Sequence, residues 1–143
     1  MPADGAADRR AVVVHGRADV ARAARIAAER GHPVTLLTAP GAADYAGPDA
    51  LLAMIEAGLA EAPGADVRAV IDCGDAAGRA QAALRAGWRW VVFSGHASAR
   101  TRLQGISAGL GARVLAERPV ALDPLDRADA QAALSVWLEG APS

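Results

Sequence analysis

Short apolar runs rich in valine, isoleucine and leucine alternate along the chain with alanine-rich segments whose apolar residues recur every three or four positions. The runs predict strands, and the three-to-four-residue spacing predicts amphipathic helices. Five strands are expected, at residues 11–16, 33–40, 67–72, 89–94 and 113–117. Five helices are expected, at residues 19–31, from about 48 to the APGAD sequence at 62–66, and at 75–87, 98–110 and within 118–140. This alternation predicts βαβ units and a parallel sheet.

The predicted fold class is α/β, a single-domain three-layer α/β/α sandwich with a five-stranded parallel sheet and helices on both faces. For this number of elements we expect the flavodoxin-like strand order 2-1-3-4-5. A chain of 143 residues is long enough to bury one core. Residues 1–10 are polar and aperiodic, so we expect a disordered N-terminal arm followed by one α/β domain over residues 11–143.

Composition excludes several kinds of chemistry. Every basic residue besides histidine is an arginine, and without lysine there is no Schiff base to a carbonyl substrate or pyridoxal phosphate and no Walker-type phosphate loop. A single cysteine excludes an internal disulfide and a multi-cysteine metal site. The net charge of −1, with both signs interspersed, indicates neither a nucleic-acid nor a membrane partner. With no signal peptide or long apolar run, we expect a cytoplasmic protein.

Ligands of open parallel sheets bind beyond the carboxyl ends of the strands, near the point where the strand order reverses. The loops after the first, third and fourth strands all contain glycine and lead into helices, whose exposed amides favour anions. We therefore expect a small anionic metabolite, with a carboxylate or phosphate, at this edge. If the protein is an enzyme, the acid/base and orienting residues would be His15, Asp72 and His96. The predicted ligand-binding residues are Gly16, Gly74, Ser94, Gly95, Ser98 and Arg100.

The same residues also suit ordinary turns and helix caps, and other chemistries stay open. His15, Asp72 and His96 could ligate zinc or iron, but no short-range pair supports a metal site, and none is predicted. Cys73, before a predicted helix, could be a nucleophile or a small buried residue. No G-x-G-x-x-G sequence supports a dinucleotide, so the cofactor and the reaction are unknown. Tyr45 lies in a long loop that could cover a pocket.

A second hypothesis is a noncatalytic dimeric scaffold or regulatory module. Trp88 and Trp90 are two residues apart, so on a strand they would share a face, and tryptophan is enriched at interfaces. Gly105 and Gly109 would allow close helix packing within the chain or across a homodimer. A homodimer is expected under either hypothesis.

Overall fold

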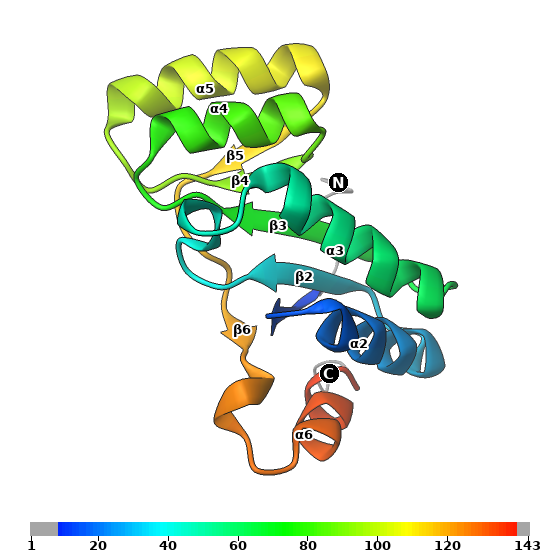
Figure 1. Cartoon of the computed structure of the whole chain (residues 1–143). Helices are drawn as coiled ribbons and strands as arrows, with labels where there is room; N and C mark the ends of the chain where they lie inside the picture. The colour runs from blue at the N-terminus through cyan, green and yellow to red at the C-terminus, as the bar shows by residue number, and fades with distance from the viewer. Residues whose placement is uncertain (1–8, 140–143) are drawn as a thin grey trace.

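The computed structural model describes residues 9–139, which form one parallel sheet and the helices that connect its strands (Figure 1). The strands are β1 (Arg10–Val14), β2 (Val34–Thr38), β3 (Val67–Asp72), β4 (Trp90–Val92), β5 (Arg113–Leu115) and β6 (Ala121–Leu122). The α-helices are α2 (Arg17–Arg30), α3 (Pro48–Glu61), α4 (Ala77–Ala86), α5 (Ala97–Leu110) and α6 (Ala130–Trp137). Two short 3-10 helices, η1 (Ala42–Asp44) and η2 (Pro124–Asp126), lie in the loops. The predicted α/β class and the parallel sheet are confirmed.

The strand order is β5-β4-β3-β2-β1-β6, and every neighbouring pair is parallel. The predicted order 2-1-3-4-5 is therefore wrong, and the sheet has six strands where five were expected. β6 was missed because it is only two residues long, too short to show an alternating pattern. It pairs with the free side of β1.

The helices form a single layer. From β1 to β5 each crossover adds one strand in the same direction, and right-handed crossovers that advance one way place their helices on one face. Neighbouring helices contact one another in the order α5, α4, α3, α2, α6, which is the order of the strands (Figure 1). The predicted three-layer sandwich is thus also wrong. It required the reversal of direction that the order 2-1-3-4-5 contains.

The sheet is curled. Residues 116–120 alone connect β5, at one edge, with β6, at the other. In a flat sheet these edges would be about 24 Å apart, whereas the six steps from Leu115 to Ala121 reach at most about 21 Å. From β1 to β5 the strands follow one another in chain order, as they do in a βα barrel, and β6 lies on the other side of β1.

Each face of the sheet has its own apolar cluster. The larger cluster lies under the helices, where strand residues such as Val12, Leu36 and Ile71 pack against alanine-rich helix faces. The smaller one lies on the concave face, where Leu37, Val70 and Val92 are buried. Trp90, Leu115 and Ala121 pack against it. Because Leu115 and Ala121 come from the two edge strands, this cluster agrees with the curl of the sheet.

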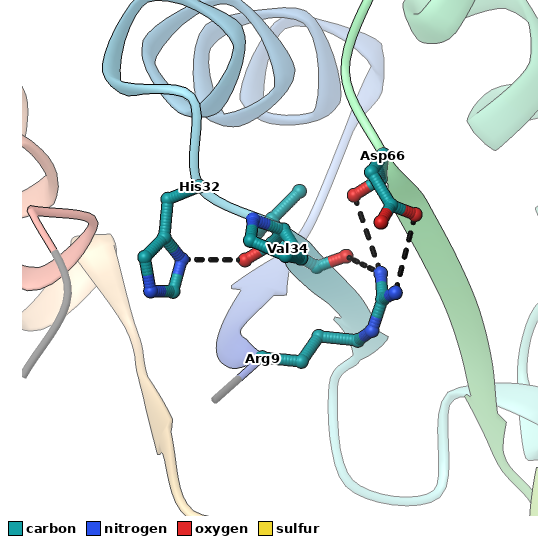
Figure 2. A network of polar contacts seen from close by, with 5 residues as sticks. Arg9, His32, Val34 and Asp66 are labelled. Carbon is teal, nitrogen blue, oxygen red and sulfur yellow. Dashed lines mark hydrogen bonds and ion pairs between the residues drawn. The ribbon is translucent and has the colours of Figure 1, made fainter. Parts of the chain in front are cut away.

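At the amino ends of the strands, Arg9 joins three segments of the chain. Its Nη1 donates to the Val34 carbonyl oxygen (3.3 Å) and the Asp66 carbonyl oxygen (3.2 Å), and its Nη2 donates to Asp66 Oδ1 (3.1 Å; Figure 2). Close by, the ring of His32 is 2.7 Å from the Pro33 carbonyl oxygen. β1 begins at Arg10, so the fold starts within the segment predicted to be an arm. The rest of that segment, residues 1–8, lies outside the described residues.

Trp88 and Trp90 do not share a face. β4 begins at Trp90, so Trp88 precedes the strand and turns into the helix-covered core, where it is 2% exposed. Its Nε1 donates to the Pro48 carbonyl oxygen (3.0 Å). Trp90 lies on the concave face, with the guanidinium carbon of Arg68 3.9 Å from its ring centroid.

A close contact between two helices lies at Gly58, a glycine that the sequence analysis did not single out. A Cβ on Gly58 of α3 would lie 2.5 Å from Cβ of Val20 on α2, so the two helices meet where only a glycine fits. Cβ atoms on Gly105 or Gly109 of α5 would meet nothing within 4 Å. The small-residue pair therefore serves no close packing among residues 9–139. Across the same residues, no helix is both long and apolar enough to cross a membrane.

Candidate functional site

Asp72, the last residue of β3, is the buried charge at the centre of the carboxyl edge. Its side chain is 5% exposed. Oδ2 accepts a hydrogen bond from Arg118 Nη1 (2.7 Å), and Oδ1 accepts one from the Gly74 amide (2.7 Å). The Asp72 amide donates to Thr38 Oγ1 on β2 (2.9 Å). Both carboxylate oxygens are thus engaged, as a buried carboxylate requires.

Arg118 lies in the segment that crosses from β5 to β6. Besides Asp72, its Nη1 donates to the Thr38 carbonyl oxygen (3.0 Å). Its Nε and Nη2 make no hydrogen bond with any of residues 9–139, and its side chain is 27% exposed. The guanidinium is therefore fixed on one side and open on the other.

His15 follows β1 and is held from two directions. Its Nε2 is 2.9 Å from Oδ1 of Asp123, which follows β6, and its amide donates to Oδ2 of Asp19 in α2 (2.8 Å). Asp123 also accepts from the Leu125 amide (3.0 Å) and so caps η2. The pairing of β6 with β1 explains why residues 108 positions apart meet here.

A pocket of about 330 Å³ opens at the carboxyl ends of β1 and β2, beside η1 and the first turns of α3. Its polar lining comes from His15, Thr38 and Tyr45. Its apolar lining comes from Val14, Ala39, Ala42, Ala46, Ala50, Leu51 and Met54. Tyr45, which was expected to lie over a pocket, is among the lining residues and is 74% exposed. Thr38 connects the pocket to Arg118 and Asp72, because its carbonyl and hydroxyl groups bind those two residues.

The loop after β4 does not line this pocket. Two strands, β3 and β2, separate β4 from β1 in the sheet, and His96 is exposed at the start of α5. Arg100 Nη2 donates to the Gly95 carbonyl oxygen of its own loop (3.1 Å). A Cβ on Gly95 would lie 2.5 Å from Cζ of Phe93, so this glycine makes a close turn. Ser94 and Ser98 are both exposed.

The remaining predicted residues lie near the edge without entering the pocket. Gly16 precedes α2, and its carbonyl oxygen accepts the amides of Asp19 and Val20. Gly74 binds Asp72 through its amide and the Ser94 amide through its carbonyl oxygen (2.8 Å), so it joins the loops after β3 and β4. Of the predicted site residues, His15 is the one that lines the pocket.

The structure gives no support to a metal site or a reactive thiol here. Between Arg9 and Glu139, no group of three or more histidine, cysteine, aspartate or glutamate side chains is placed to hold a metal ion. His15, Asp72 and His96 therefore do not converge as ligands. Cys73 is fully buried, and burial, together with the negative charges of Asp72 and Asp44, raises the pKa of its thiol to about 12. The thiol thus stays protonated, so Cys73 is a packing residue.

Sequence reasoning missed Arg118, Thr38 and Asp123. One signal for Arg118 was available: Asp72 directly follows the apolar residues 69–71, so a buried carboxylate there needs a cation, and in a chain without lysine an arginine is the strongest candidate. Which arginine supplies it depends on the path of residues 116–120. Comparison with known proteins adds no assignment, since no family model and no curated protein sequence matches the chain.

Proposed function

We propose that this protein binds a small anionic metabolite at the carboxyl edge of its sheet. The carboxylate or phosphate of the ligand binds the open side of Arg118, and its apolar part enters the pocket beside His15 and Tyr45. The observation that carries the proposal is the guanidinium of Arg118, which is fixed by Asp72 and by Thr38, a residue that also lines the pocket.

A fixed arginine is a favourable anion site for a physical reason. Its planar group presents donors in a rigid fork that matches carboxylate and phosphate oxygens. Because Asp72 and Thr38 already hold Nη1, little side-chain freedom is lost when an anion binds. The Asp72 carboxylate balances the single positive charge of Arg118, so an anion at the open side would be held by hydrogen bonds from Nε and Nη2.

The pocket limits the size and character of the ligand. Ligand pockets commonly span about 300–1,000 Å³, so about 330 Å³ fits a small molecule. Most lining residues are apolar, which favours a ligand with a short hydrocarbon portion. If the site is catalytic, His15 is the predicted acid/base residue that can reach the ligand, oriented by Asp123. Asp72 is committed to Arg118 and supports the site by positioning that residue.

The test is a thermal-shift screen of the full chain against phosphorylated and carboxylated metabolites, followed by calorimetry on any hit. A specific ligand raises the melting temperature because it binds the folded state. In the double variant Asp72→Asn/Arg118→Gln, which removes both charges together, the affinity should fall at least tenfold. Ala50→Phe, at an exposed position that lines the pocket, should block the apolar part of the ligand. Arg25→Gln, exposed on α2, is the control and should bind normally.

No shift with any member of the panel would contradict the proposal, as would equal binding by the double variant and the unaltered chain. Retained binding by Ala50→Phe would instead place the whole ligand outside the pocket.

One observation favours the second candidate, a noncatalytic dimeric module in the cytoplasm. Three large apolar side chains after β5 are exposed, namely Val120 (85%), Leu125 (69%) and Val136 (69%). We propose that a homodimer would use this part of the chain, since Trp88 is buried in the core. Light scattering should then give the mass of a dimer for the unaltered chain and of a monomer for Val120→Asp/Val136→Asp. A monomer in both cases would refute this candidate.

A further inference from the structure

β3 has a strand on only one side along its first four residues. Val67–Val70 pair with Val34–Leu37 of β2, whereas the pairing with β4 includes only Ile71 and Asp72. The cause is the stagger of β4, which begins at Trp90, opposite the second half of β3. The first four residues of β3 therefore form an open edge inside the sheet.

The backbone direction shows which groups face this opening. The Cys73 amide donates to the Val92 carbonyl oxygen (2.9 Å), whereas the Asp72 amide donates to Thr38 on the β2 side. Backbone groups of successive strand residues point to opposite neighbours. Val67 and Ala69 consequently direct their N–H and C=O groups to the side where β4 has not begun. The pairing between β3 and β4 does not include these two residues.

A pocket of about 450 Å³ lies along this open edge. Val67, Arg68 and Ala69 line one side, and residues 87–90 line another. Arg9 and Leu52 complete the lining, which includes three arginines and no carboxylate.

Arg89 places a positive charge at this pocket. Arg9 is paired with Asp66, but Arg89 is exposed and donates to the Leu110 carbonyl oxygen, which is uncharged. Within residues 9–139, Arg89 has no carboxylate partner. The guanidinium of Arg68 lies over the Trp90 ring, so a cation and an aromatic surface form one wall.

We propose that an extended acidic segment of a partner protein adds here as a strand on β3. Unpaired strand edges bind extended peptides through main-chain hydrogen bonds, while neighbouring pockets select the side chains. Four partner residues, about 13 Å long, would match Val67–Val70. Acidic side chains would face Arg89, and apolar ones would contact Leu52 and the indole of Trp90. The open backbone groups of β3 favour a peptide over a nucleic acid, which cannot continue the ladder.

The open edge of β3 lies at the amino ends of the strands, away from the proposed ligand site at their carboxyl ends. A partner and a metabolite could therefore bind at the same time. Failure of one proposal leaves the other untouched.

The experiment uses the ¹⁵N-labelled full chain and a library of acetylated hexapeptides that alternate Glu with Val, Ile, Leu or Phe. We expect shifts of the amide signals of Val67, Ala69 and residues 87–90. The same library with Lys in place of Glu, or with N-methylated backbones, should bind at least tenfold more weakly. Equal binding of the N-methylated library, or of a single-stranded oligonucleotide, would overturn the proposal, as would the absence of any shift.

Two variants test separately how the backbone of β3 and the charge of Arg89 contribute to peptide binding. Ala69→Pro removes the N–H that faces the opening but not the bonds to β2, so the chain should fold and lose affinity at least tenfold. Arg89→Glu, at an exposed position, should exchange the preference from the Glu library to the Lys library. Arg25→Glu, a matched reversal on α2, should change neither. Unchanged binding of the Glu library by Ala69→Pro and by Arg89→Glu would refute strand addition at this edge.

Discussion

Nη1 of Arg118 lies 2.7 Å from Oδ2 of Asp72, a residue 46 positions earlier in the chain. The contact joins the end of β3 to the segment that crosses from β5 to β6, and Thr38 of β2 takes part through its carbonyl oxygen. One ion pair thus connects the middle of the sheet to the segment that closes its curl.

Loss of Arg118 should destabilise the fold more than loss of the pair. Arg118→Gln leaves the buried Asp72 carboxylate without its cation, so the free energy of unfolding should fall by about 2–3 kcal/mol. Asp72→Asn/Arg118→Gln should recover at least half of that loss, because no buried charge remains. Urea denaturation gives the free energy of unfolding of both variants and of the unaltered chain. A double variant less stable than Arg118→Gln would show that the ion pair is not the reason.

The buried thiol of Cys73 should make stability depend on alkaline pH. Its pKa rises from 9.0 to about 12 on folding, so below pH 9 both states hold the proton. Between pH 9 and 12 the unfolded chain releases a proton that the folded chain keeps, so stability falls, by at most about 1.4 kcal/mol per pH unit. Denaturation of the unaltered chain and of Cys73→Ala across this range isolates the effect, since other groups titrate in both proteins. If the free energy of unfolding fell equally steeply with pH in both proteins, the buried thiol would not be the cause.

The same thiol should be unreactive in the folded protein. At pH 8 a disulfide reagent should label Cys73 only after denaturation, because the side chain is fully buried and protonated. Rapid labelling of the native chain would show that the thiol is accessible.

Two glycine-to-alanine changes on helices should have opposite effects. Gly58→Ala places a methyl group 2.5 Å from Val20 and should destabilise the protein by about 1–3 kcal/mol, since α2 and α3 must separate. Gly105→Ala meets nothing on α5 and should stabilise it by about 0.5–1 kcal/mol through helix propensity. Thermal and urea denaturation give the stability of each variant relative to the unaltered chain. Stabilisation by Gly58→Ala would mean that the helices do not meet there.

Trp137 should hold α6 against β1. Its Nε1 donates to the Ala11 carbonyl oxygen (2.8 Å), and the guanidinium of Arg10 lies 4.8 Å from its ring centroid. Trp137→Phe keeps a ring but removes the donor, so stability should fall by about 1 kcal/mol and the α6 amides should exchange faster with deuterium. Val136→Ala, on the exposed side of the same helix, is the control and should change stability by less than about 0.5 kcal/mol. Equal exchange in both variants would refute this role.

Part of the candidate site could be predicted. Asp72 and His15 were expected at the carboxyl ends of β3 and β1, because each ends a clear apolar run. Their partners Arg118 and Asp123 could not be predicted, because these residues follow β5 and β6. Their positions depend on how the chain crosses the curled sheet. His96 was expected beside His15 because the predicted order put one strand between β1 and β4, whereas the structure puts two.

By itself, the sequence determined the five longer strands and the helices that follow them, as at β3, where the predicted and observed bounds are both Val67–Asp72. Local periodicity and glycine stops act over a few residues, so they can be seen in the chain. Tertiary structure alone decided the strand order, the single helix layer and the pairing of β6 with β1. These features depend on which distant strands share hydrogen bonds and on the direction of each crossover. When parallel strands have similar apolar patterns, the local sequence of one strand does not identify the strands beside it.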